Sequence, residues 1–292
     1  MNSLPTLINL PPFLIRDINE KNLTFFSKIK LIFIGKFLSL IINKTEKKLF
    51  CRLINSLFKK DGQIIYQNGQ YIKLKDNTKI IHYPNKRILR VVKSIDYQLE
   101  LILNSYCLDK VIFENQDIVI DCGANVGELN LAIEKRKDVK IKYYGFEPDA
   151  ETFKSLLLNN PENSETLFEL GLSNENKKME FFLDTEGGNS SLVDFGAKNK
   201  VEIKTIKLDS LKINGKIKLI KVEAEGFEPE VLLGSENTLA HTELVSVDFG
   251  PERGIEAENT VVQVNNILTK VGFELIEFSQ YRIAGLYKNI LI

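Results

Sequence analysis

The stretch that most constrains the fold is 117–127, where a short apolar run ends in a glycine-containing loop and leads into a helical pattern. Ile118, Val119 and Ile120 are consecutive β-branched residues, as in a parallel strand that helices cover on both faces. Residues 128–136 then repeat apolar positions at helical spacing. Strand, loop and helix in this order predict an α/β fold with a ligand at the loop, although a turn without a ligand stays an open alternative.

The loop reads D-C-G-A-N-V-G, which differs from the dinucleotide fingerprint G-x-G-x-x-G. In that fingerprint the second glycine lets the backbone touch a pyrophosphate, whereas Asn125 stands at the corresponding position here. We therefore expect a ligand without a pyrophosphate, and S-adenosylmethionine is the candidate cofactor. Gly123 and Gly127 permit a close backbone approach, and amides at the helix start suit a polar ligand. Cys122 in the same loop is interpreted as a packing residue.

Polar side chains follow the predicted strands at their carboxyl ends, the edge at which α/β sheets bind ligands. Glu147 ends the strand 141–146, about 20 residues after the glycine loop, and is placed to bind a ribose diol. Asp149 is interpreted as the N-cap of the next helix. Leu172 and Ser173 follow the strand 166–170, where the adenine is expected.

Three acids are the candidates for removing a proton from the acceptor: Glu223, Glu225 and Asp248. Glu223 ends the strand 217–223 and Glu225 follows two residues later, and strand alternation points both to one side. Asp248 lies near the carboxyl end of the strand 244–249. The same acids could instead hold a divalent cation, and solvated surface glutamates are the weaker alternative because the run before them is apolar. No metal ligand is assigned.

The last two predicted strands, 273–278 and 284–290, are separated only by residues 279–283. A parallel crossover needs a dozen or more residues, so this pair must be antiparallel. A parallel sheet that ends in such a hairpin differs from the dinucleotide fold.

Residues 24–60 have a helical pattern with an uneven charge. Basic residues far outnumber the acidic one, Glu46, and are Lys28, Lys30, Lys36, Lys44, Lys47, Lys48, Arg52, Lys59 and Lys60. One apolar stripe is formed by Leu49, Phe50, Leu53, Ile54, Leu57 and Phe58. A helical cap with a solvated basic face is the favoured interpretation, and a surface that lies on anionic lipid is the alternative.

The segment that follows switches to strand spacing. Asn68-Gly69 predicts a hairpin within residues 63–83, with a third strand at 79–83. Residues 87–108 then have the pattern of a helix that leads into the strand before the glycine loop.

The composition excludes several classes of protein. Among 292 residues, 39 lysines and arginines balance 39 acids, so net charge gives no reason to expect nucleic acid as a partner. The three cysteines are scattered, which predicts reduced thiols in a cytoplasmic protein. Residues 1–22 lack a signal peptide pattern, and the most apolar stretch, 29–43, is short of the roughly 20 residues that a bilayer needs. Under the lipid alternative, residues 24–60 contact the inner face of the membrane peripherally.

Five motifs occur together in one order over residues 95–292. They are Val119–Gly127, G-F-E-P-D at 145–149, G-N-S-S-L at 188–192, L-D-S-L at 208–211 and Leu219–Glu228. On these motifs the chain resembles the FkbM-type methyltransferases, a family of S-adenosylmethionine-dependent O-methyltransferases.

The resemblance implies a Rossmann-like class I methyltransferase fold, with a mostly parallel seven-stranded sheet and a terminal antiparallel hairpin. In this chain the fold is extended by an N-terminal helical segment and a small β-meander. The predicted division is 1–60 for the arm and basic amphipathic helices, 61–110 for the meander and linking helix, and 111–292 for the cofactor-binding domain.

The resemblance also implies site residues. Gly123, Asn125 and Gly127 would hold the methionine part of the cofactor. The full predicted cofactor set is Asp121, Gly123, Ala124, Asn125, Gly127, Glu147, Pro148, Leu172, Ser173 and Glu223. The predicted substrate set is Asn189, Ser190, Ser191, Glu225 and Arg253. The family usually has Asp-x-Glu-Gly where this chain has Glu223-Ala-Glu-Gly226.

The implied reaction is methylation of a sugar hydroxyl in glycan or natural-product biosynthesis, with a small-molecule or glycan acceptor. Two alternatives stay open: a non-catalytic cofactor-binding module, and a nicotinamide-dependent sugar-nucleotide oxidoreductase. Asn125 and the terminal hairpin disfavour the second of these.

Overall fold

The computed structural model describes residues 24–58, 60–183 and 190–292. The chain divides into two compact units, Met1–Gln98 and Leu99–Ile292, and the division falls within helix α4 (Ile95–Ser105). The predicted boundaries near residues 60 and 110 stay predictions, and the predicted substrate residue Asn189 lies outside the described residues.

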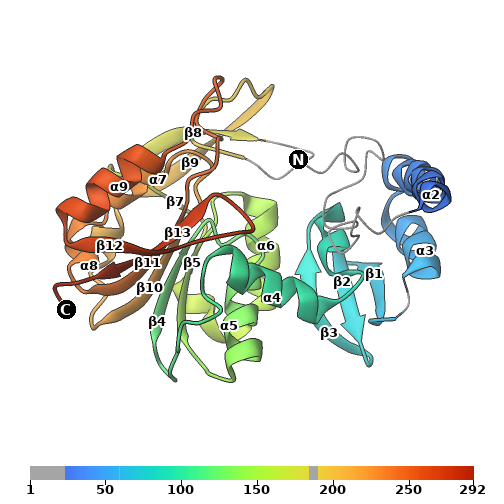
Figure 1. Ribbon diagram of the computed structural model, residues 1–292, viewed down its shortest axis with the longest axis horizontal. Helices are drawn as coiled ribbons and strands as arrows, with labels where there is room; N and C mark the ends of the chain where they lie inside the picture. The colour runs from blue at the N-terminus through green and yellow to red at the C-terminus, as the bar shows by residue number, and fades with distance from the viewer. Residues whose placement is uncertain (1–23, 59, 184–189) are drawn as a thin grey trace. The chain divides into compact units, whose positions relative to one another are not determined.

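The described residues of the first unit form two helices, a three-stranded antiparallel sheet and a 3₁₀ helix (Figure 1). Its elements are α2 (Phe25–Lys44), α3 (Lys47–Leu57), β1 (Gln63–Gln67), β2 (Gln70–Lys75), β3 (Thr78–Tyr83) and η3 (Lys86–Val91). Helix α3 contacts β1, and α2 contacts α3. Asn68 and Gly69, with φ of 51° and 80°, form the turn between β1 and β2, which confirms the predicted hairpin.

Two predictions for this region are wrong in detail. The single helix predicted at 87–108 is divided into η3 and α4, because Asn85 and Ser94 each cap a separate segment. The Asn85 side chain accepts a hydrogen bond from the Arg87 amide (2.9 Å), and the Ser94 hydroxyl accepts one from the Tyr97 amide (3.1 Å). In the predicted stripe of α3, Phe50 and Ile54 are buried but Leu49 and Leu57 are exposed.

The second unit is built on a seven-stranded sheet with the order β12-β13-β11-β10-β4-β5-β6. The strands are β4 (Ile118–Cys122), β5 (Lys142–Phe146), β6 (Leu167–Phe168), β10 (Ile217–Val222), β11 (Thr242–Asp248), β12 (Phe273–Phe278) and β13 (Ala284–Asn289). Neighbouring strands are parallel except that β13 is antiparallel to both β11 and β12. This confirms the predicted sheet and its terminal hairpin.

Helices cover both faces of this sheet, with α5 and α6 on one side and α7, α8 and α9 on the other (Figure 1). Their bounds are α5 (Glu128–Lys137), α6 (Ala150–Asn159), α7 (Glu228–Leu233), α8 (Glu236–Leu239) and α9 (Val261–Lys270), with short 3₁₀ helices η4 (Pro161–Thr166) and η5 (Leu208–Leu211). Val119, Leu219 and Val247 are completely buried in central strands, and each such side chain contributes about 1.5–3 kcal/mol by burial.

A second, smaller sheet has the order β7-β9-β8. It is formed by β7 (Gly171–Leu172), β8 (Lys177–Leu183) and β9 (Asn199–Ile206). The strand predicted at 166–170 is therefore wrong in extent, because only Leu167 and Phe168 pair with β5 before the chain joins β9.

The position of the site follows from the strand order. The chain runs outward from β4 to β5 and β6 on one side, and from β10 to β11 on the other, so the direction reverses between β4 and β10. Ligands bind at such a switch point, beyond the carboxyl ends of the strands. There Cys122 pairs with Val222, and Asp121 pairs with Lys221.

Candidate active site

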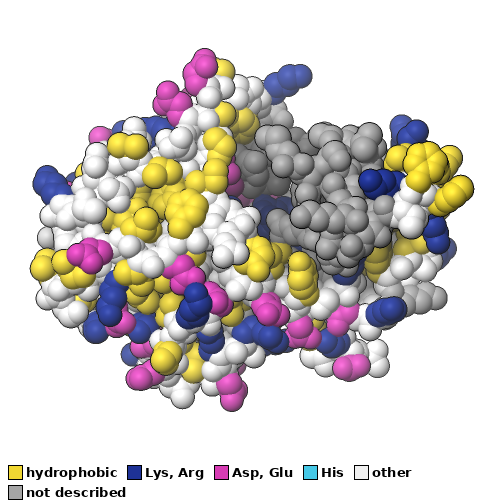
Figure 2. Space-filling view, viewed as in Figure 1, with side chains coloured by type: hydrophobic (Ala, Val, Ile, Leu, Met, Phe, Trp, Pro, Cys, Tyr) yellow, Lys and Arg dark blue, Asp and Glu magenta, His cyan; other side chains and the backbone are white. Residues whose placement is uncertain are grey.

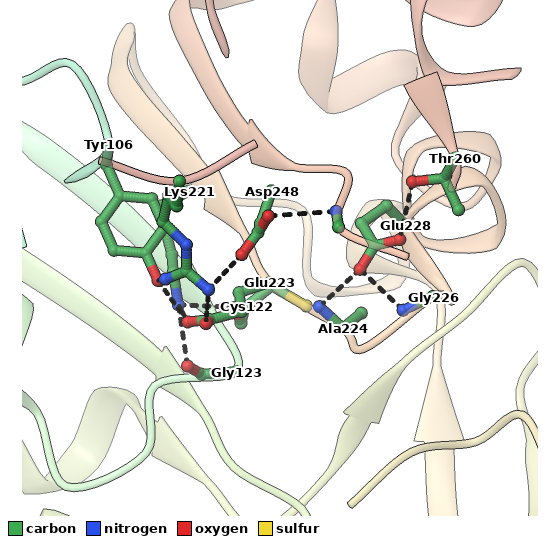
Figure 3. Close-up of polar contacts among 12 residues, drawn as sticks. Tyr106, Cys122, Gly123, Lys221, Glu223, Ala224, Gly226, Glu228, Asp248 and Thr260 are labelled. Atoms are coloured by element: carbon green, nitrogen blue, oxygen red, sulfur yellow. Dashed lines mark hydrogen bonds and ion pairs between the residues drawn. The ribbon is translucent and has the colours of Figure 1, made fainter. Parts of the chain in front are cut away.

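A cluster of charged side chains lies at the switch point (Figure 3). Its members come from the carboxyl ends of β4, β10 and β11, from the chain after α4 and from the turn between β12 and β13. We call Tyr106, Asp121, Lys221, Glu223, Asp248 and Arg282 the charged cluster.

Lys221 is the buried cation at the base of this cluster, with 2% of its surface exposed. Its ammonium group lies 3.0 Å from Asp121 and 3.1 Å from Glu223, and it donates to the carbonyls of Cys122 (3.2 Å) and Gly123 (2.8 Å). Burial disfavours the charge, but attraction to the two carboxylates outweighs it and holds the pKa of Lys221 well above its ordinary value. Lys221 therefore ties the end of β10 to the beginning of the glycine loop.

Glu223 has partners on both carboxylate oxygens. Oε1 accepts from Arg282 (2.7 Å), and Oε2 accepts from the Tyr106 hydroxyl and pairs with Lys221. Burial acts to raise the pKa of Glu223, but the two neighbouring cations hold it well below the ordinary value. Glu223 is thus a weak proton acceptor, and its predicted catalytic role, which this arrangement disfavours, stays a prediction.

Asp248 ends β11 and pairs with the same Arg282 guanidinium. Its Oδ1 accepts a hydrogen bond from the Gly250 amide (3.1 Å). Burial raises the pKa of Asp248 to about 7, against the lowering effect of Arg282. This carboxyl group therefore changes protonation near neutral pH, as a general base requires.

The turn that follows β10 places Glu225. The strand ends at Val222, and Glu225 (φ 50°) and Gly226 (φ 95°) have left-handed backbones, so the turn, and not strand alternation, sets the direction of the Glu225 side chain. A Cβ atom at Gly226 would lie 2.6 Å from the Arg253 Cα, so only glycine fits there.

A buried acid, Glu228, accepts hydrogen bonds from the backbone of this turn. Glu228 Oε1 accepts from the amides of Ala224 and Gly226, both at 3.0 Å, and Thr260 donates to Oε2 (Figure 3). Glu228 is therefore a positioning residue, because it fixes the backbone that carries Glu225.

The Glu225 side chain is half-buried, and its Oε2 is a buried atom without a hydrogen-bond partner among the described residues. Burial, with the neighbouring Glu223 and Glu252, raises the pKa of Glu225 to about 10. Glu225 is therefore protonated at neutral pH and can donate a hydrogen bond, but it is a poor proton acceptor until it ionises.

Two residues of the predicted substrate set also hold this turn. The Ser191 hydroxyl donates to the Glu225 carbonyl (2.7 Å). The Arg253 guanidinium donates to the Gly226 carbonyl (2.5 Å) and binds Glu230 with both terminal nitrogens (2.9 and 2.6 Å). Ser190 is half-buried next to Ser191. Direct substrate contact by these residues stays a prediction.

The glycines of the loop are required by packing within the protein. A Cβ atom at Gly123 (φ 71°) would lie 2.0 Å from the Glu223 carbonyl oxygen. At Gly127 (φ 83°), which begins α5, it would lie 2.2 Å from the Asn160 amide nitrogen. These contacts let the loop lie close to β10 and α6.

Most of the loop amides have partners inside the protein. Gly123 and Ala124 donate to the Phe146 carbonyl (3.1 and 2.9 Å), and Asn125 donates to the Glu147 carboxylate (2.9 Å). Helix α5 begins without a side-chain cap at Gly127. These three amides precede the helix start, so the expectation that the amides at the beginning of α5 suit a polar ligand stays a prediction.

Glu147 is the buried acid at the end of β5. Its second oxygen accepts from the Asp149 amide (3.0 Å), so both oxygens are oriented by backbone groups. Asp149 accepts from the Thr152 amide (2.8 Å), which confirms it as the N-cap of α6. Pro148 is half-buried between the two acids. An oriented carboxylate at this edge suits the hydroxyls of a ribose.

The remaining predicted cofactor residues lie deeper in the protein. Asp121 is buried and accepts from the Tyr143 hydroxyl (2.6 Å), so it supports the loop from within the sheet. Leu172 and Ser173 are buried beside the smaller sheet, where the Ser173 amide donates to the Ile206 carbonyl (2.9 Å). Burial raises the pKa of Cys122 far above its ordinary value, in agreement with a packing role.

Tyr106, Lys221 and Arg282 were not predicted as site residues. Lys221 did have a signal, because a lysine inside an apolar run of a central strand must find a buried partner. Arg282 had a weaker one, since an antiparallel last strand brings the 279–283 turn to the carboxyl end of β11. We found no sequence signal for Tyr106.

The donor set fits a ligand that carries a positive charge and hydroxyl groups. Three carboxyl groups (Asp121, Glu223 and Asp248) pair with two cations, and one buried oxygen of Glu225 has no hydrogen-bond partner among the described residues. S-adenosylmethionine has both features, a sulfonium and a ribose diol. Within the described part of the chain, no group of three or more His, Cys, Asp or Glu side chains is arranged to hold a metal ion, so the cation alternative gains no support.

Comparisons with known proteins identify the family that the chain matches. A family model described as the methyltransferase FkbM domain matches residues 121–275, more than half of the 292 residues. The hexuronic acid methyltransferase AglP of Haloferax volcanii is 29% identical over 141 residues, which cover 47% of this chain and 57% of that protein. The chain therefore matches little more than half the length of this relative.

Solved structures with similar folds are more distant in sequence. An FkbM methyltransferase from Methylobacillus flagellatus is 13% identical with a TM-score of 0.46, covering 70% of this chain and 56% of that chain. M. jannaschii TYW2, solved in complex with AdoMet, is 11% identical with a TM-score of 0.39, covering 78% of this chain and 90% of that chain.

Proposed function

Because the chain belongs to the FkbM methyltransferase domain family, we propose that it transfers a methyl group from S-adenosylmethionine to a hydroxyl group of a sugar. The single observation that carries this proposal is Asp248, a carboxyl group with a pKa near neutrality at the ligand-binding edge of β11. Family membership confirms the predicted FkbM-type family and S-adenosylmethionine as its cofactor, whereas the predicted domain bounds 111–292 stay a prediction. The methyltransferase assignment therefore replaces the alternative of a nicotinamide-dependent oxidoreductase.

We assign the cofactor to the loop and the neighbouring strand end. Glu147 would accept hydrogen bonds from the ribose hydroxyls, and the left-handed turn at Asn125 would lie along the methionine part. The carboxylates of the charged cluster favour a positively charged ligand. S-adenosylmethionine, when bound, supplies an electrophilic methyl group.

In this proposal Asp248 accepts the proton of the attacking sugar hydroxyl. Arg282 pairs with both Glu223 and Asp248 and so orients Asp248. The Arg282 guanidinium also donates a hydrogen bond to the Tyr106 hydroxyl oxygen (2.7 Å). Protonated Glu225 donates a hydrogen bond to the acceptor. General base catalysis contributes about 10²- to 10⁴-fold, and alignment of the reacting atoms can supply about 7–11 kcal/mol.

The proposed class of acceptor follows from the similarity to the AglP protein. The AglP protein of Haloferax volcanii is a hexuronic acid methyltransferase, and the matched region overlaps little more than half of it. We therefore propose a glycan or a related natural product as the acceptor, with hexuronic acids as the first candidates.

Methyl transfer to a matched pair of sugars tests this proposal. Purified protein is incubated with methyl-labelled S-adenosylmethionine and either p-nitrophenyl glucuronide or p-nitrophenyl glucoside, which differ only at C6. We expect labelled sugar that survives mild alkali, because a methyl ether is stable where a methyl ester is hydrolysed. Alkali-labile label would show that the carboxylate is the acceptor. A folded protein that binds the cofactor but labels no sugar of a wider panel would favour the non-catalytic binding module.

A further inference from the structure

Helix α2 has apolar side chains on two opposite faces. Gly35, Leu38 and Ile41 are buried, as expected for the face that packs on the rest of its unit. The opposite face has an apolar stripe at helical spacing, with exposed fractions between 36% and 82%, formed by Phe26, Ile29, Phe33, Phe37 and Leu40. Figure 2 shows hydrophobic side chains gathered over this helix. Such a contiguous stripe indicates an interaction surface.

Helix α2 has defined ends and a hydrogen bond to another element of its unit. Thr24 caps the beginning of α2 by accepting from the Ser27 amide (3.2 Å), and the Lys86 ammonium donates to the Ile42 carbonyl (2.6 Å) near its end. The Thr45 amide also donates to the Ile41 carbonyl (3.0 Å). The two caps define where α2 begins and ends, and Lys86 ties its last turn to the rest of the unit.

The charge around the stripe is positive. Lys30 and Lys36 each lie three residues from Phe33, so they border the stripe on either side. Among the described residues 24–58, the acidic side chain is Glu46, and the basic ones are Lys28, Lys30, Lys36, Lys44, Lys47, Lys48 and Arg52. The long stems of lysine can follow an apolar surface while their charges reach the phosphates of lipid headgroups.

We propose that α2 binds parallel to the surface of an anionic bilayer, with the stripe among the acyl chains and the lysines at the headgroups. Charge decides between this occupant and a second copy of the chain. Two copies that met through the stripe would bring the same lysines together, whereas an anionic surface complements them. None of the helices in the described part of the chain is both long and apolar enough to cross a bilayer. An interfacial helix does not need to meet this requirement.

Vesicle sedimentation with the full chain tests this proposal independently of methyl transfer. We expect the wild type to bind vesicles of phosphatidylcholine mixed with phosphatidylglycerol, and to bind phosphatidylcholine alone at least roughly tenfold more weakly. High salt should reduce the difference, because it screens the charges.

Two variants separate the apolar and charged contributions. The triple variant Phe26→Ser, Phe33→Ser and Phe37→Ser should lose at least roughly tenfold in vesicle binding, and Lys30→Glu with Lys36→Glu should lose the preference for anionic lipid. Matched controls with exposed residues of the other unit are Ile112→Ser, Ile255→Ser and Val262→Ser, and Lys207→Glu with Lys270→Glu.

The controls should bind within about twofold of the wild type, because they remove comparable groups away from α2. Retained cofactor binding and circular dichroism would show that the variants fold. Equal binding to both kinds of vesicle, or unchanged binding by the triple phenylalanine variant, would overturn the proposal. Self-association without lipid that the phenylalanine variant abolishes would assign the stripe to a second copy instead.

Discussion

Asp248→Asn is expected to lower the rate of methyl transfer by about 10²- to 10⁴-fold while the affinity for S-adenosylmethionine changes little. Asparagine keeps the shape of the side chain and an oxygen that can accept from the Gly250 amide (3.1 Å), but it cannot take a proton. Single-turnover rates at saturating cofactor measure the effect. They separate the chemical step from product release.

The pH dependence of the wild type gives a second test of the same residue. Burial raises the pKa of Asp248 to about 7, so below this pH the group carries a proton and cannot act as a base. The rate should therefore fall about tenfold per pH unit below 7 and become constant above it. A variant that retains the wild-type rate and pH profile would remove Asp248 from the mechanism.

Glu223→Gln is the informative comparison for Asp248→Asn. Because the pKa of Glu223 lies well below its ordinary value, this residue stays ionised throughout the range in which Asp248 titrates. We expect the glutamine variant to keep the pH dependence near 7 and to lose activity through misplacement of Arg282, which Glu223 holds at 2.7 Å. Loss of the pH dependence in Glu223→Gln would exchange the roles of the two acids.

Lys221→Met should destabilise the protein by about 3–5 kcal/mol. The substitution leaves the carboxylates of Asp121 and Glu223 buried without the cation that lies 3.0 and 3.1 Å from them. Urea unfolding measures the change, as a lower midpoint with an unchanged m-value.

Two further variants control this experiment. Lys216→Met removes an exposed ion pair with Glu243 (2.9 Å), and such pairs contribute about 0–1 kcal/mol. Lys221→Met combined with Asp121→Asn should recover part of the lost stability, because it also removes one unpaired charge. A loss in Lys221→Met no larger than in Lys216→Met would show that the buried cation is not needed for stability.

Much of the sheet could be predicted because local rules determine it. The short 279–283 segment allows only an antiparallel hairpin, and the apolar run before Asp121 suits only a strand covered on both faces. The structure has both features. The caps at Asn85 and Ser94 were also readable in principle, since each is a side chain of the type that begins a helix.

The details of the site could not be predicted, because they depend on contacts between distant segments. Glu225 owes its position to a left-handed turn held by Glu228, and nothing in the spacing of the two glutamates indicates that turn. Glu223 is ionised because Arg282 and Lys221 lower its pKa, whereas Glu225 is protonated because burial and neighbouring acids raise its pKa. Likewise, the strand predicted at 166–170 ends at Phe168 in the main sheet because the following residues form β7, which pairs with β9 through a long-range contact.

The most direct test of the account is calorimetric titration of S-adenosylmethionine into the wild type, Glu147→Gln and the control Glu151→Gln, with NAD as a second ligand. Glu151 is an exposed acid on the neighbouring helix α6. We predict saturable binding by the wild type and the control, no binding of NAD, and affinity at least roughly tenfold lower in Glu147→Gln, which loses a charged acceptor at the ribose. Absence of binding to the folded wild type, or equal affinity in all three proteins, would contradict the assignment of the cofactor to this site.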